Sequence, residues 1–177
     1  MKKIIAFAGS NSKNSINKQL ATYASGLVID AEVDILDLND FKLPLFGVDL
    51  EKQLGGQPEN AHKFLNRIKE SDGIVLSLAE HNGAYATVFK NLLDWMSRIE
   101  SKTFFGKPML LMATSTGGRG GKSVLSIAQN RFPYHNANIV DVFSLPLFND
   151  NFSSGKISNE ELNEELKSKV KAFQEAL

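Results

Sequence analysis

The stretch GSNSKNSIN at residues 9–17 is crowded with small hydrogen-bonding side chains. It follows an apolar run and precedes a segment with helical spacing, so a strand is expected to lead into a helix here. The first turn of that helix would offer unpaired backbone N–H groups and the positive end of its dipole. Hydroxyls of Ser10, Ser12 and Ser15 and the amide of Asn17 would add donors, a combination that suits a phosphate group. The stretch also fits an ordinary capping turn, so both interpretations stay open.

Two further loops also follow apolar runs. AEHNGAY, at residues 79–85, supplies a carboxylate, an imidazole and an amide beside Gly83, which permits close backbone approach or a positive φ. His81 is a single histidine in this loop, and such a residue more often has a structural role than a catalytic one. TSTGGRGGKS, at residues 114–123, contains glycines that would let the backbone lie flat along an aromatic ring system.

The third loop also suggests a nucleotide hydrolase. Gly121, Lys122 and Ser123 match the end of the P-loop signature G-x-x-x-x-G-K-[ST], but its first position is Thr116 instead of glycine. The chain that follows Gly121 is too short for the rest of an NTPase core. This alternative therefore depends on the end of one motif alone.

Other catalytic chemistries find little support among the residues. The chain has no cysteine, which excludes disulfides, thiolate catalysis and zinc–thiolate sites. A G-x-S-x-G elbow for serine hydrolysis is absent. His62, His81 and His135 are scattered along the chain, so no metal site is expected. If the protein is an enzyme, its chemistry is expected to reside in a bound cofactor.

The elements that would position these loops alternate between strand and helix. Several strands read as continuous apolar runs, which suits a parallel sheet covered on both faces. Ligands bind such sheets outside the carboxyl ends of the strands, where the three loops would meet. Strands are predicted at 3–8, 31–38, 73–79, 108–115 and 137–145, and helices at 15–27, 58–71, 85–100, 121–132 and from Ser158 to the end, with a long surface loop at 39–58.

Composition narrows the class of protein. The length of 177 residues predicts a single domain, 1–177. Twenty basic and twenty acidic residues cancel, so nothing in the bulk charge favours nucleic acid or an anionic membrane as a partner. No apolar stretch approaches the length of a membrane span, and the run that follows Lys3 is too short for a signal peptide. A cytoplasmic location is expected.

The three motifs together resemble those of the NADPH-dependent FMN reductase family, over residues 1–148 and with a fitting last helix. The family's first motif resembles G-S-x-R-x-x-S-x-N, and Ser12 stands where an arginine is common. Its second resembles P-E-Y-N-G-x-x-P-x-x-L-K-N-x-x-D-W. Ala79, His81 and Ala86 replace a proline, the tyrosine and the second proline. The third is a serine- and glycine-rich loop like STGGRGG.

The resemblance implies a flavodoxin-like, doubly wound three-layer sandwich whose five-stranded parallel sheet has the order 2-1-3-4-5. It also implies FMN as cofactor, with NADPH or NADH as co-substrate. A quinone, a free flavin or a similar small molecule would accept the electrons, and the chain would form a homodimer or a dimer of dimers. The main alternative is a flavodoxin-type electron carrier without NAD(P)H activity.

The resemblance further implies that the flavin performs the chemistry itself, so that no side chain is a catalytic acid or base. His81 is then expected to modulate the reaction. The residues expected to bind the cofactor are Ser10, Ser12, Ser15, Ile16, Asn17, Ala79, Glu80, His81, Asn82, Gly83, Ser115, Thr116, Gly117, Gly118 and Arg119.

Overall fold

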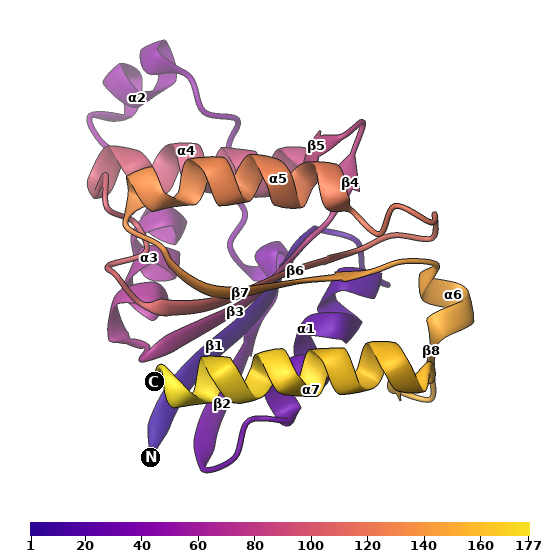
Figure 1. Cartoon of the computed structure of the whole chain (residues 1–177). Coiled ribbons are helices and arrows are strands. Elements are labelled where there is room, and N and C mark those ends of the chain that lie inside the picture. Colours follow the sequence, from indigo (N-terminus) through magenta and orange to yellow (C-terminus); the bar gives the residue numbers. More distant parts are fainter.

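The computed structural model describes residues 1–177, in which five parallel strands form one sheet between two layers of helices (Figure 1). The strand order is β2-β1-β3-β6-β7. Counting only the strands of this sheet, the order is 2-1-3-4-5, so the predicted doubly wound fold is confirmed. The strands are β1 (Lys2–Gly9), β2 (Ala31–Leu36), β3 (Gly73–Leu78), β6 (Pro108–Thr114) and β7 (Asn138–Leu145).

Each face of the sheet carries its own apolar core. On one face, α1 (Ile16–Gly26) and α7 (Glu160–Glu175) pack against alternate residues of the strands. On the other, α3 (Glu59–Glu70), α4 (Thr87–Ile99) and α5 (Lys122–Arg131) cover the remaining residues. All six residues of β3 are buried, as its continuous apolar run predicts for a strand covered on both sides.

The segment predicted as a long surface loop, 39–58, is more structured than its glycines and prolines suggest. The 3₁₀ helix η1 (Leu38–Asp40) and the helix α2 (Val48–Leu54) lie within or beside it. The indole N–H of Trp95 in α4 donates to the carbonyl of Pro44, 2.8 Å away. These tertiary contacts hold the segment against α4, beyond which α2 projects in Figure 1.

Several short elements are not predicted from sequence periodicity because they are too brief to show it. They are the hairpin β4–β5 (Glu80–His81 and Ala84–Tyr85), η2 (Phe132–His135), α6 (Phe148–Asn151) and the hairpin β8–β9 (Phe152–Ser153 and Lys156–Ile157). The last helix, predicted from Ser158, is α7 (Glu160–Glu175), so its predicted start is wrong by two residues. Asn159 is the N-cap, because its side chain accepts the N–H of Leu162.

Candidate functional site

The loop between β1 and α1 presents backbone N–H groups that have no acceptor in the chain. The N–H groups of residues 13–17, which run from the turn before the N-cap Ser15 into the first turn of α1, donate to no acceptor in the chain. Ser15 is the N-cap, and its hydroxyl accepts the N–H of Lys18 at 3.1 Å. The capping interpretation and the phosphate interpretation are therefore compatible, since the cap occupies one N–H and leaves the others for an anion.

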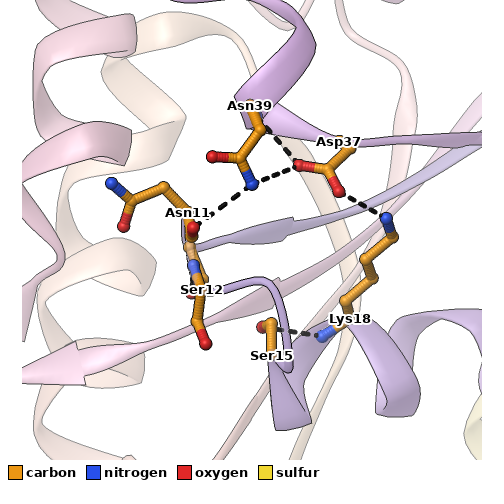
Figure 2. A network of polar contacts seen from close by, with 7 residues as sticks. Asn11, Ser12, Ser15, Lys18, Asp37 and Asn39 are labelled. Carbon is orange, nitrogen blue, oxygen red and sulfur yellow. Dashed lines mark hydrogen bonds and ion pairs between the residues drawn. The ribbon is translucent and has the colours of Figure 1, made fainter.

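A polar network ties this loop to the end of β2 (Figure 2). The ammonium of Lys18 lies 2.6 Å from the carboxylate of Asp37. The other carboxylate oxygen of Asp37 accepts the backbone and side-chain N–H groups of Asn39, whose side chain also donates to the carbonyl of Asn11. Asn11 belongs to the β1–α1 loop, whereas Asp37 and Asn39 follow β2. The network therefore holds the backbone of this loop through residues that belong to another segment of the chain.

The network also sets the charge state of Asp37. Burial by itself would raise the pKa of this carboxyl, but hydrogen bonds from Lys18 and Asn39 outweigh it and lower the pKa below its ordinary value of 3.8. A carboxyl whose pKa is depressed by folding stabilises the fold above its unfolded pKa, and this contribution is lost as the pH falls through the folded value. The ion pair is thus fully formed at neutral pH.

Sequence reasoning did not single out Lys18, Asp37 or Asn39. A usable signal existed, because Asp37 directly follows β2 and so lies at the same edge of the sheet as the three loops.

Asn17 lies in the same loop region but turns its side chain into the protein. Its Oδ1 accepts the hydroxyl of Ser77 at 2.7 Å and the N–H of Thr114 at 2.9 Å. Its Nδ2 donates to the carbonyl of Thr114 at 3.2 Å. Asn17 therefore joins the start of α1 to β3 and β6 at the carboxyl edge of the sheet, and only its backbone N–H is left without an acceptor in the chain.

The second loop is a tight hairpin. Asn82 and Gly83 have φ values of 52° and 75°, which match a two-residue turn of type I′ between β4 and β5. The backbone N–H groups of both turn residues have no acceptor in the chain. His81 is exposed and makes no side-chain hydrogen bond within the chain.

Glu80 turns toward the third loop. Its carboxylate accepts the N–H of Val124 at 2.9 Å, in the first turn of α5. The positive end of α5 is therefore already occupied by a carboxylate, which would repel a phosphate at that position. This contact argues against the P-loop interpretation of residues 116–123.

The glycines of the third loop fall into two groups. Gly120 and Gly121 have φ values of 56° and 75°, and a Cβ on either would lie 2.5 Å from Ser144 Oγ or 2.7 Å from Ala113 Cβ respectively. These two glycines are required by the fold. A Cβ on Gly118 would meet nothing within 4 Å, and one on Gly117 only Ser115 Oγ at 3.9 Å. The open space beside these two fits a flat ligand that approaches the backbone closely.

The three loops meet at the carboxyl edge of the sheet, as the fold requires. The predicted site residues are therefore brought to one edge, although they differ in what they offer to a ligand. Asn17 and Glu80 have side chains engaged within the protein, and Ala79 is buried. Exposed groups remain at Ser12, His81, Asn82 and 116–119. That these residues bind the cofactor stays a prediction.

A doubly wound parallel sheet of this strand order, with acceptor-free N–H groups after β1 and open space beside two glycines after β6, has the architecture of a flavodoxin-like fold. The sequence model of NADPH-dependent FMN reductases matches residues 2–150. The chain belongs to this family, whose cofactor is FMN and whose electron donor is NAD(P)H. The predicted resemblance is confirmed.

Individual relatives agree with this assignment. The chain is 35% identical over 120 residues to a 2-hydroxy-1,4-benzoquinone reductase of Burkholderia sp, an alignment that covers 67% of this chain and 63% of that relative. The match thus spans less than two thirds of the relative's length. The flavoenzyme FerB of Paracoccus denitrificans, an NAD(P)H:(acceptor) oxidoreductase, superposes with a TM-score of 0.78 at 24% identity, covering 99% of this chain and 97% of FerB.

Flavodoxin 1 of Bacillus cereus superposes with a TM-score of 0.64 at 18% identity, covering 100% of this chain and 99% of the flavodoxin. At these identities both superpositions show the shared fold and nothing more. No helix of the chain combines the length and apolar character that a membrane crossing demands.

Proposed function

We propose that this chain is an NAD(P)H-dependent, FMN-containing oxidoreductase that delivers electrons to a quinone, a free flavin or a similar small acceptor. The observation that carries the proposal is the run of acceptor-free N–H groups at 13–17, which faces the same edge of the sheet as the open surface of Gly117 and Gly118. The first fits a phosphate and the second a flat ring. FMN has both.

When bound, FMN supplies the redox chemistry, taking a hydride from NAD(P)H and giving electrons to the acceptor. The chain's own residues would bind FMN and orient its ring. The N–H groups of residues 13–17 would hold the phosphate without a cation. The free N–H groups of Asn82 and Gly83 would donate to a polar edge of the ring and stabilise negative charge there.

An enzyme is favoured over a one-electron carrier by the small residues around the ring surface. Gly83, Gly117 and Gly118 leave that region without bulky side chains. Trp95 is fully buried in α4 and bonded to Pro44, so it does not cover the site. One face of the ring would then stay open to nicotinamide, as direct hydride transfer needs.

The decisive experiment mixes the FMN-loaded protein with NADPH or NADH without oxygen and follows flavin absorbance by stopped flow. The proposal expects direct bleaching, and recovery when a quinone is added. If both nucleotides leave the flavin oxidised while dithionite reduces it, the carrier interpretation holds instead. His81→Ala is expected to lose less than the roughly 10²–10⁴-fold typical of a missing acid or base, because exposed His81 would only modulate the transfer.

Lys18→Met is expected to weaken FMN binding roughly tenfold, or about 1.4 kcal/mol. The substitution leaves the carboxylate of Asp37 without its cation, next to the β1–α1 loop that would hold the phosphate. Fluorescence titration with FMN measures the effect. The matched control is the double variant Lys18→Met with Asp37→Asn, which is charge-neutral and should recover most of the affinity. If Lys18→Met binds FMN with the same affinity as the unaltered protein, the phosphate lies elsewhere.

We propose that the chain forms a homodimer or a dimer of dimers. We also propose a cytoplasmic location. Leu45, Val48 and Leu54 are 73%, 56% and 52% exposed, and all belong to the segment held on α4. Clustered exposed apolar side chains favour a protein contact. Light scattering at micromolar concentration should give a multiple of the chain mass, and Leu45→Lys should shift it toward the monomer. A monomeric unaltered protein would refute the dimer and leave the flavin proposal intact.

A further inference from the structure

A groove of about 620 Å³ begins at the β1–α1 loop (residues 10–15, the phosphate loop) and follows the outer flank of α1. Lys13, Asn14 and Ser15 line its beginning, and Gly26 and Leu27 line its far end. The β8–β9 hairpin forms the opposite wall through Phe152 and Gly155. At 1.5 Å per residue, the stretch of α1 between the two ends is roughly 16 Å long. The groove is thus continuous with the proposed phosphate site but leads away from the ring loops.

The lining changes character along its length. Two cations, Lys13 and Lys18, lie near the phosphate end. Farther along are the aromatic rings of Tyr23 and Phe152, which contact each other edge to face with centroids 6.0 Å apart. From the phosphate end onward, the lining of the groove is first positively charged, then polar, and finally aromatic and apolar. A ligand that fits this order has an anionic end, a polar middle and a flat apolar end.

The hydroxyl of Tyr23 donates to Asn163 of α7 at 2.6 Å, which fixes the ring against the groove. Its phenol group is therefore satisfied, and the ring offers an apolar surface in a set position. Lys13 makes no ion pair, whereas Lys18 is already paired with Asp37. Lys13 is accordingly the cation that is left for an additional phosphate.

We propose that this groove binds an adenylate unit, with its phosphate beside Lys13 and its purine toward Tyr23 and Phe152. The proposal rests on the proposed function, because it takes the flavin phosphate to be bound at residues 13–17. Two ligands carry such a unit. FAD would place it directly beyond the flavin phosphate, and NAD(P)H would bring it with the nicotinamide. The groove's continuity with the phosphate loop suits the first arrangement.

The test fills the groove and leaves the flavin site unchanged. Thr22 is exposed on α1 and lines the middle of the groove, so Thr22→Trp would obstruct it. Tryptophan and threonine have similar helix propensities, so folding should be retained. Thr22→Glu is a second variant, which acts by charge instead of bulk. Ser168→Trp, at an exposed position of α7 outside the groove, is the control.

Fluorescence titrations with FMN and FAD, and initial rates against NADPH and reduced nicotinamide mononucleotide, are measured on all variants. The unaltered protein should bind FAD, and both Thr22 variants should weaken FAD about tenfold while FMN affinity stays constant. A rise in KM for NADPH alone, without change for the mononucleotide, would support the adenylate site with the co-substrate as its source. If neither FAD nor NADPH responds, the proposal is overturned. Failure of the unaltered protein to bind FMN would instead refute the proposed function.

Discussion

Ser15→Asp is expected to weaken FMN binding by about a thousandfold. The new carboxylate would stand among the free N–H groups of residues 13–17, against the phosphate dianion. Two unit charges 4 Å apart at an effective dielectric constant near 20 repel by roughly 4 kcal/mol, which corresponds to about three orders of magnitude in affinity. Flavin fluorescence titration of the cofactor-free protein measures the change.

The chemistry of helix capping provides a close control for this prediction. Ser15 caps α1 by accepting the N–H of Lys18, and aspartate and asparagine are equally good caps. Both Ser15→Asp and Ser15→Asn should therefore keep the stability of the unaltered chain. Only the charged variant should lose FMN. Near-normal FMN affinity in Ser15→Asp would place the phosphate at another part of the edge.

Asn17→Ala is expected to lower the free energy of unfolding of the cofactor-free protein by about 3 kcal/mol or more. The side chain makes three buried hydrogen bonds, to the hydroxyl of Ser77 and to the N–H and carbonyl of Thr114. Removing it leaves buried polar groups without partners, which costs more than the bonds themselves. Urea unfolding followed by circular dichroism measures the loss.

Two companion variants distinguish a structural Asn17 from a ligand-binding one. Ser77→Ala removes one donor from the cluster and should cost about 1 kcal/mol. Asn130→Ala, which removes an exposed bond to the carbonyl of Ser126, should change stability by less than about 0.5 kcal/mol. If Asn17→Ala unfolds like the unaltered protein but binds FMN poorly, the side chain contacts the ligand and its internal bonds contribute little.

Most of the fold could be predicted from the sequence, because a strand that is covered on both faces of the sheet is a continuous apolar run. β3 is apolar throughout, and β2 alternates, which the structure explains by its place at the edge of the sheet. Those patterns predicted the main strands and helices to within a few residues. The hairpins β4–β5 and β8–β9 have strands of two residues, too short for any period to appear.

The candidate site was predicted less completely. The placement of three polar loops after buried strands followed from the order of the elements, since parallel strands end at one edge. The roles within the loops did not follow. Asn17 and Glu80 have the residue types of ligand contacts, yet their partners are Thr114 and Val124, far away in the sequence. Only the folded chain brings those groups together.

The sequence by itself determined the alternation of strands and helices, the edge of the sheet at which the three polar loops meet and, through its motifs, the family. These properties depend on local spacing and on burial, which each segment carries within itself. The tertiary structure alone decided which glycines serve the fold and which leave room for a ligand. It also decided that Lys18 pairs with Asp37, and that a groove continues from the phosphate loop. The physical reason is that a contact between distant residues depends on distances that only chain packing sets.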